Sequence, residues 1–155
     1  MITKPGALVR AAILAGLAGG AADILTAFVI YRPASPVRIL QAVGSGLLGA
    51  ASFEGGMGSA AVGLIAHFAI AIIFGGIFVA AATQAPVALR KPVLSGLLYG
   101  IVVYGVMNSI VVPLSMAAER TTPPDHMTAL GLMAHAFFGL ALSFTAARML
   151  RKTVI

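Results

Sequence analysis

The stretch MGSAAVGLIAHFAIAIIFGGIFVAAAT, residues Met57–Thr83, contains no charged side chain. A helix needs about 20 consecutive apolar residues to cross the hydrocarbon core of a bilayer, and this stretch is long enough. Three other stretches meet the same criterion: Ala7–Tyr31, Pro92–Ala118 and Met127–Leu150. Backbone polar groups in lipid must bond internally, and runs of this length do so as helices rather than as barrel strands. The sequence therefore predicts an all-α membrane protein with four transmembrane helices.

The composition agrees with this fold class. Of the 155 residues, 60% are hydrophobic and 9% are charged, whereas about a quarter of the residues in soluble domains are charged. The segments between the four stretches are too short for a soluble domain, so residues 1–155 are expected to form one helical bundle. The chain has no cysteine, which excludes disulfides, thiolate metal ligands and thiol nucleophiles.

A short helix is predicted between the first two spans. Ser35 and Pro36 pair an N-cap hydroxyl with a proline at the first helical position, and Gly55-Gly56 is a helix stop. The apolar run between these signals is short for a span. We therefore expect an interfacial or re-entrant helix over residues 36–53, and a fifth span is the alternative.

The positive charges predict the orientation. The net charge of +6 comes from basic residues near helix ends, where they set topology and contact anionic headgroups, so a nucleic-acid partner is not expected. With four spans, one side holds Lys4, Arg10, Arg90, Lys91, Arg148, Arg151 and Lys152, and the other holds Arg32, Arg38 and Arg120. The excess of Lys and Arg on the first side predicts that both termini are cytoplasmic. Arg148, Arg151 and Lys152 are expected to anchor the last span in lipid headgroups.

Each span carries one polar side chain on a stripe of mostly small residues spaced three or four apart. These side chains are Asp23, His67, Asn108 and His135. The glycines of these stripes are Gly16 and Gly20, Gly63 and Gly75, Gly96 and Gly100, and Gly131 and Gly139. Small residues allow close helix packing in lipid, so the four groups are predicted to face other helices or a cavity. Tyr99 and Tyr104 are candidates for lining that cavity. Four spans place all four groups in one layer near the outer face, whereas five spans would leave Asp23 alone, which favours four.

Two roles are open for this polar cluster. The simpler one is interhelical hydrogen bonding, worth about 1 kcal/mol. The second is functional, because ionisable groups inside a membrane mark functional sites and imidazole titrates near neutral pH. Asp and His side chains in a polar layer that opens to the outer face of the membrane predict a proton-sensing or proton-relay site.

The other function classes receive less support from the sequence. His67 and His135 lie at matching depth on separate spans and could ligate a b-type haem, zinc or another metal, but two histidines are a minimal signal. No cofactor and no metal are therefore expected. No catalytic motif is present, so the chain is not expected to be an enzyme. The main alternative to an autonomous site is a homo-oligomer or an accessory subunit of a larger membrane complex.

The second half of the chain carries a series of short motifs. They are His67-Phe68, Arg90-Lys91-Pro92, SGLLYG at 95–100, Met107-Asn108-Ser109, VPLS at 112–115 and GLMAH at 131–135. In these motifs the region Gly63–Arg151 resembles the YagU-like family of small bacterial inner-membrane proteins. The resemblance implies a bacterial inner-membrane location and a link to acid resistance. It does not cover Asp23, whose role rests on the membrane argument alone.

Overall fold

The structure is a computed structural model that describes residues 5–32, 34–117 and 125–154. The side chains of Asp125, His126 and Lys152 lie outside the described part. The long helices are α1 (Pro5–Ile30), α3 (Gly56–Gln84), α5 (Pro92–Val106) and α7 (Asp125–Val154). A π-helical turn, η2 (Met107–Val111), and α6 (Val112–Leu114) extend α5. The remaining elements are α2 (Pro36–Leu48), the 3-10 helix η1 (Gly49–Phe53) and α4 (Val87–Arg90).

Four helices are long and apolar enough to cross a membrane, which confirms the predicted fold class. They cover Pro5–Ile30, Gly56–Gln84, Pro92–Leu114 and Met127–Arg151. α1 packs between α3 and α7, and α7 also packs against α5. The α3 and α5 backbones lie farther apart, and side chains such as Tyr99 on α5 and Phe78 on α3 join them. Residues 36–53 form no fifth candidate span, because α2 has only 13 residues, so the predicted count of four is confirmed and the alternative of five is wrong.

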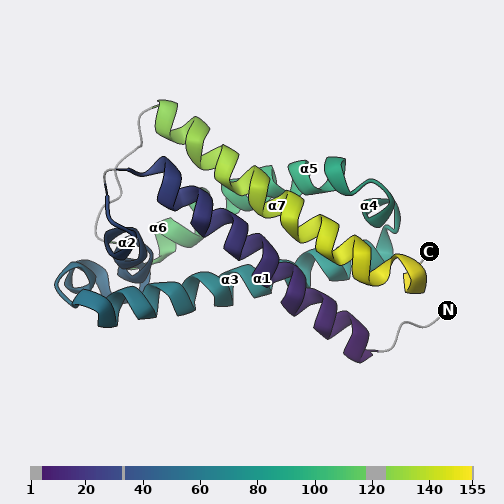
Figure 1. The fold of residues 1–155 in the computed structure, drawn as a ribbon, viewed down its shortest axis with the longest axis horizontal. Coiled ribbons are helices and arrows are strands. Elements are labelled where there is room, and N and C mark those ends of the chain that lie inside the picture. The colour runs from purple at the N-terminus through teal and green to yellow at the C-terminus, as the bar shows by residue number, and fades with distance from the viewer. Residues whose placement is uncertain (1–4, 33, 118–124, 155) are drawn as a thin grey trace.

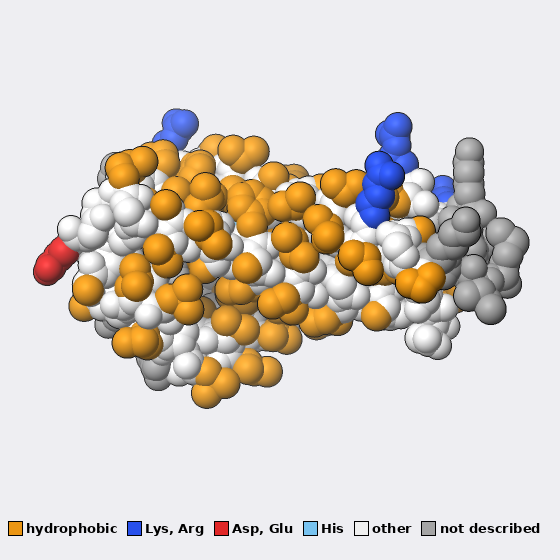
Figure 2. All heavy atoms as spheres, turned by 90° about the horizontal axis from the view of Figure 1, so that it is seen from below, with side chains coloured by type: hydrophobic (Ala, Val, Ile, Leu, Met, Phe, Trp, Pro, Cys, Tyr) orange, Lys and Arg blue, Asp and Glu red, His pale blue; other side chains and the backbone are white. Residues whose placement is uncertain are grey.

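The two ends of the bundle differ (Figure 1). The chain termini and α4 lie at one end, here called the terminal end, and α2 and α6 lie at the other, here called the α2 end. Figure 2 shows that apolar side chains cover the middle of the molecule, while the charged side chains in view lie toward its two ends. Exposed apolar side chains on the spans include Ile65, Ile73 and Val29. The chain is therefore a multi-pass membrane protein.

Glycines set the closest helix crossings, as the small-residue stripes predict. At the α1–α3 crossing, a Cβ on Gly16 would lie 2.6 Å from the Cα of Ile72. At the α5–α7 crossing, a Cβ on Gly139 would collide with the carbonyl oxygen of Gly96. In both places the obstacle is backbone, so a side chain could fit only if the helices moved apart.

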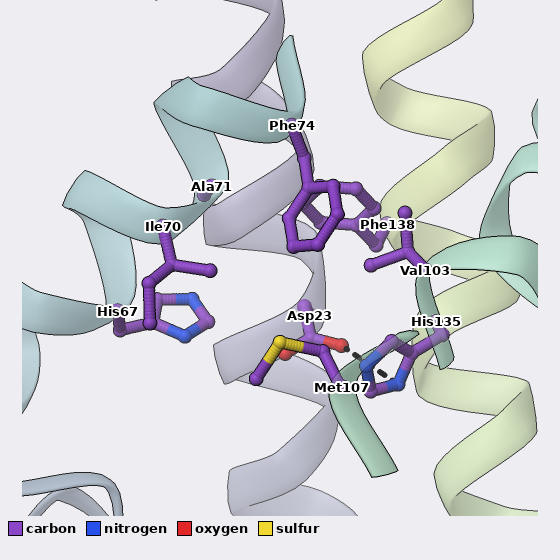
Figure 3. A pocket seen from close by; sticks show the side chains of 9 residues that line it. All are labelled: Asp23, His67, Ile70, Ala71, Phe74, Val103, Met107, His135 and Phe138. Carbon is purple, nitrogen blue, oxygen red and sulfur yellow. Dashed lines mark ion pairs between the residues drawn. The ribbon is translucent and has the colours of Figure 1, made fainter. Parts of the chain in front are cut away.

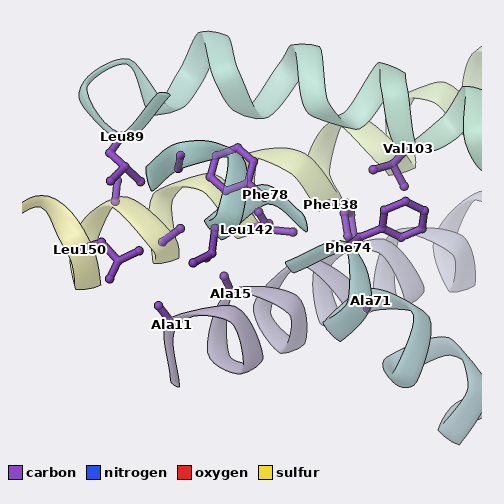
Figure 4. Packing of buried hydrophobic residues seen from close by; sticks show 14 residues of the cluster. Ala11, Ala15, Ala71, Phe74, Phe78, Leu89, Val103, Phe138, Leu142 and Leu150 are labelled. Atoms are coloured by element: carbon purple, nitrogen blue, oxygen red, sulfur yellow. The ribbon is translucent and has the colours of Figure 1, made fainter. Parts of the chain in front are cut away.

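The half of the bundle toward the terminal end is closed by apolar packing (Figure 4). The buried cluster there includes Ala11, Phe78, Leu89, Leu142 and Leu150. Leu89, Leu142 and Leu150 are at most 1% exposed. All buried members of this cluster are apolar, and the buried Ser143 hydroxyl beside Leu142 is bonded to the Pro92 carbonyl. The cluster therefore offers water no free polar side chain.

The short helix begins where the capping signal predicts. The amide of Arg38 donates to the Ser35 hydroxyl at 3.2 Å, and Pro36 occupies the first turn. The buried amide of Gln41 donates to the Gly56 carbonyl at 3.1 Å and to the Ser59 hydroxyl at 3.3 Å, which fixes α2 to the start of α3. α2 is seen nearly end-on in Figure 1 while α3 runs along the picture, so the two helices cross steeply. An interfacial position for α2 stays a prediction.

Arg151 has a structural role that the sequence did not reveal. Its Nε donates to the Leu89 carbonyl at 3.0 Å and its Nη2 to the Arg90 carbonyl at 2.8 Å. These carbonyls belong to α4, a single turn whose carbonyls lack helical partners. Arg151 therefore ties the end of α7 to the connection between α3 and α5.

Replacing Arg151 by glutamine should lower the free energy of unfolding by about 1 kcal/mol, because two charge-assisted hydrogen bonds at an exposed site are lost. Arg148→Gln is the matched control, since it removes the same charge from an exposed residue that makes no side-chain hydrogen bond within the described residues. Its effect should stay within about 0.5 kcal/mol. Thermal unfolding in detergent measures both. Equal losses of stability in the two variants would show that the lost charge, and not the lost contact with α4, is responsible.

Candidate functional site

A small cavity lies between the four spans, nearer the α2 end (Figure 3). All four spans contribute to its lining: Asp23 from α1, His67, Ile70, Ala71 and Phe74 from α3, Val103 and Met107 from the α5 span, and His135 and Phe138 from α7. Its volume is about 50 Å³. A water molecule needs roughly 10–15 Å³ on this measure, so the cavity has room for a few waters.

Asp23 provides the negative charge of this cavity. It is the one acidic residue within the four candidate spans, and its side chain is 17% exposed. Its Oδ1 atom is buried and has no hydrogen-bond partner in the described part of the chain. A buried carboxylate oxygen without a partner is costly, and water in the cavity or a bound proton would remove the cost.

His135 lies beside Asp23 on α7. Its Nδ1 is 3.7 Å from Asp23 Oδ1, which is within ion-pair distance but too long for a hydrogen bond. The same Nδ1 donates to the Gly131 carbonyl at 2.9 Å, which places a proton on that nitrogen. In the neutral ring Nε2 is therefore the acceptor, and it can take up the second proton.

His67 lies on the opposite side of the cavity on α3 (Figure 3). Its Nε2 donates to the Gly20 carbonyl of α1 at 2.9 Å, one turn before Asp23. Its Nδ1 is the acceptor of the neutral ring. The two histidines thus carry fixed protons on nitrogens bonded to backbone and have one basic nitrogen each.

Two tyrosines lie between His135 and the α2 end. A Cβ placed on Gly131 would be 3.7 Å from the Tyr31 hydroxyl and 4.0 Å from the Tyr104 hydroxyl. Tyr104 also packs edge-on against the His135 ring, with centroids 5.3 Å apart. Both hydroxyls therefore lie near the carbonyl that accepts from His135, on the way from the cavity to the α2 end.

Tyr31 is the functional candidate that sequence reasoning missed. It follows the last residue of α1, and its sequence position reads as an interface anchor. Burial raises the pKa of its hydroxyl above the ordinary value of 10.0, and the negative charge of Asp23 adds to the rise. Tyr31 therefore keeps its proton at physiological pH and remains a hydrogen-bond donor. Its distance of about two helical turns from Asp23 is the signal that could have found it.

Asn108 is not brought to the cavity, in contrast to the prediction from the four-residue stripe. Its side chain is exposed, and Nδ2 donates to the carbonyl of Tyr104 at 2.8 Å. Each step of four residues overshoots a helical turn by about 40°, so three steps from Gly96 rotate Asn108 by about 120°. The stripe therefore leads from the α7 contact at Gly96 to the outside of the bundle.

The other predicted site residues lie elsewhere. The Tyr99 hydroxyl donates to the Phe74 carbonyl at 2.6 Å and joins α5 to α3 without lining the cavity. Tyr104 adjoins the cavity through His135 but is not one of its lining residues. Arg148 is exposed near the terminal end. A lipid-anchoring role for Arg148 and Arg151 stays a prediction.

The helix of the third span is irregular where it passes the cavity. The Val112 amide bonds to the Met107 carbonyl, five residues back, which forms a π-helical turn. Pro113 follows directly and has no amide proton to continue the ordinary pattern. Single π-turns inside α-helices occur frequently at functional sites. Here the turn begins at Met107, which lines the cavity.

The cavity is closed toward the terminal end. Three apolar side chains lie about one to two turns nearer the terminal end than the polar part of the lining: Phe74 on α3, Val103 on α5 and Phe138 on α7. All three belong to the buried apolar cluster. Figure 4 shows these three side chains at one edge of that cluster. The site therefore has a polar side facing the α2 end and an apolar floor facing the terminal end.

The cavity does not fit the haem alternative. Pockets for ligands of that size measure about 300–1,000 Å³, far above the volume between His67 and His135. Within the described residues, no group of three or more His, Asp or Glu side chains is placed to hold a metal ion. The groups present are suited to exchanging protons and to binding water.

The chain matches no family model, no curated protein and no solved structure. The resemblance to the YagU-like family therefore stays a prediction, and the function has to be argued from the cavity.

Proposed function

We propose that this protein is a bacterial inner-membrane protein with cytoplasmic termini that binds protons in the Asp23 cavity from the outer side. The observation that carries the proposal is the buried Oδ1 of Asp23, which has no hydrogen-bond partner in the described structure and lies 3.7 Å from His135. A carboxylate between two histidines forms a set of proton acceptors at one depth in the membrane.

The size of the cavity supports the proton as the bound species. About 50 Å³ admits water but no organic solute. The groups facing His135 are Asp23 from α1, Tyr104 from α5 and, across the cavity, His67 from α3. Imidazole changes charge between about pH 5 and 8, so this set can respond to physiological changes in pH.

The shape of the site supports one-sided access. Tyr31 and Tyr104 place hydroxyls between His135 and the α2 end, whereas Phe74, Val103 and Phe138 form the apolar floor. A proton-linked role of this kind needs no catalytic step. It also agrees in kind with the acid-resistance link that the YagU-like resemblance implies.

The charges of the described residues support the orientation. Arg10, Arg90, Lys91, Arg148 and Arg151 belong to helix ends at the terminal end. The α2 end carries Arg32 and Arg38 together with the acidic Glu54. Loops rich in Lys and Arg stay in the cytoplasm, which favours an outward-facing α2 end and a cavity that samples the outer medium.

The direct test is the protonation of the cavity histidines in lipid bilayers. Nitrogen NMR of ¹⁵N-histidine-labelled protein should show the rings of His67 and His135 gaining a proton as the medium is acidified stepwise across the physiological pH range. His67→Gln and His135→Gln assign the two signals, and His126→Gln removes the third. Ring signals of both cavity histidines that stay constant over this range would contradict the proposal.

A further inference from the structure

The outward face of α5 is unusually free of partners for a helix in a bundle. In the third span, 11% of the 18-residue apolar window is buried, against 33% in each of the other three spans. Among the described elements, α5 packs extensively only against α7 and η2. A large part of its surface is therefore turned away from the rest of the chain.

The exposed residues of α5 follow a seven-residue repeat. Leu94, Ile101 and Asn108 are seven apart, and Leu98 and Gly105 lie between them with the same spacing. Leu94, Leu98 and Ile101 are between 52% and 55% exposed. Residues that repeat every seven positions, in steps of four and three, line one side of a helix. Two helices that pack as a left-handed pair contact each other along such a line of residues, here called the seam.

Two residues of this seam have the properties of a helix–helix contact in lipid. A Cβ on Gly105 would meet nothing within 4 Å, so the backbone there is open to close approach by another helix. Asn108 lies six residues before the end of the span, about 9 Å along the helix, and so within the hydrocarbon layer. Its amide makes one hydrogen bond within the described structure, to Tyr104 of its own helix.

The side-chain amide of Asn108 indicates which kind of partner packs on this face. An exposed amide in hydrocarbon gains from a bond across a helix interface. An amide carries both donor and acceptor, so it is complementary to a second copy of itself. In a two-fold symmetric pair, a residue near the axis meets its own counterpart. An acyl chain offers the amide no bond.

A groove beside the seam provides additional contact surface. Leu97 and Ile101 of α5 and Ala129, Leu132, Met133 and Ala136 of α7 line it, and its volume is about 370 Å³. All of these side chains are apolar, so the groove accepts aliphatic side chains from a facing helix. It shares Ile101 with the seam, so one partner helix can occupy both.

We propose that two copies of this chain pair through α5, with Leu94, Leu98, Ile101, Gly105 and Asn108 at the interface and the Asn108 amides bonded across a two-fold axis. This inference is independent of the proton site, whose lining side chains face the bundle interior. The interface leaves the α2 end and the terminal end of each copy free.

The test is dimerisation of the full chain in lipid vesicles. Two preparations carrying different fluorescent proteins are mixed at decreasing protein-to-lipid ratios, and energy transfer gives the dissociation constant. Gly105→Leu should weaken the dimer at least about tenfold because the added side chain separates the two backbones. Gly76→Leu is the matched control, because a Cβ there also meets nothing within 4 Å but Gly76 lies on α3.

The outcomes separate a second copy from lipid. A dimer that Gly105→Leu weakens and Gly76→Leu does not supports the interface. Equal dissociation constants for Gly105→Leu and wild type, or energy transfer that never exceeds random proximity, would overturn the proposal and leave lipid on this face. Asn108→Leu should weaken the dimer about threefold to twentyfold, the range of single polar contacts between membrane helices.

The absence of native cysteine gives a second readout. Ile101→Cys should form a disulfide-linked dimer on oxidation in native membranes, because seam residues of paired helices approach within disulfide distance. Ile73→Cys on α3 is the control, since Ile73 is 62% exposed and Ile101 is 52% exposed. Equal cross-linking at both positions would indicate random collision and would overturn the assignment to α5.

Discussion

Replacing Gly139 by alanine is expected to lower the free energy of unfolding by about 3 kcal/mol or more, the upper range for overpacking in a protein interior. The added Cβ would collide with the Gly96 carbonyl oxygen. Neither atom can rotate away, because the carbonyl is part of the α5 backbone and the Cβ is bonded directly to the α7 backbone. Relief requires α5 and α7 to separate. Separation would also break the hydrogen bond from the Ser143 hydroxyl to the Pro92 carbonyl at 2.7 Å.

The matched control is Gly76→Ala. A Cβ at Gly76 has open space around it, and alanine favours a helix by up to about 1 kcal/mol over glycine. This variant should therefore unfold at the same temperature as wild type or slightly above it in detergent. If Gly139→Ala were as stable as Gly76→Ala, the close crossing of α5 and α7 would be wrong.

The largest functional effect is expected from Asp23→Asn, measured as proton flux into vesicles under an imposed pH gradient. Phe74→Ala should thin the apolar floor of the cavity and raise the small proton leak across it, because Phe74 is one of the three side chains that form this floor. Asp23→Asn in the Phe74→Ala background should then lower the flux by about a hundredfold, the lower range for loss of a positioned proton-transfer group. The asparagine keeps the shape of the side chain and removes only its charge and its proton site.

The control for charge is Glu54→Gln in the same background. Glu54 is an exposed carboxylate at the α2 end, so its neutralisation should leave the flux unchanged. Because Phe74→Ala removes a large buried side chain, Phe74→Leu is the second variant if the first does not fold. A flux that Asp23→Asn leaves at the level of the Phe74 variant would show that protons pass without Asp23, and the proposed site would be wrong.

The sequence predicted the parts of the fold that depend on length, hydropathy and local signals. The four spans follow from uninterrupted apolar runs, and the start of α2 follows from Ser35 and Pro36. The stripes with Gly16 and Gly139 also predicted where helices approach closely. These features are local because each depends on residues within a few turns of one helix.

The candidate site was predicted in part. Asp23, His67 and His135 line one cavity, as their stripes indicated. Asn108 does not, because steps of four residues drift around a helix and accumulate over three turns. Tyr31 was missed because its approach to Gly131 depends on how α1 meets α7, which no pattern within one helix contains. The partners of Arg151 likewise belong to α4, a turn without a sequence signal of its own.

The apolar floor of the cavity also has a consequence for the membrane potential. Moving one charge through the whole potential changes its energy by about 2.3 kcal/mol per 100 mV. A water-filled path has nearly the same electrical potential along its length. With water between Asp23 and the α2 end, most of the membrane potential would therefore fall across the apolar layer that begins at Phe74, Val103 and Phe138. A proton reaching Asp23 from that end would cross little of the field. Its binding would report the acidity of one compartment and remain almost insensitive to voltage.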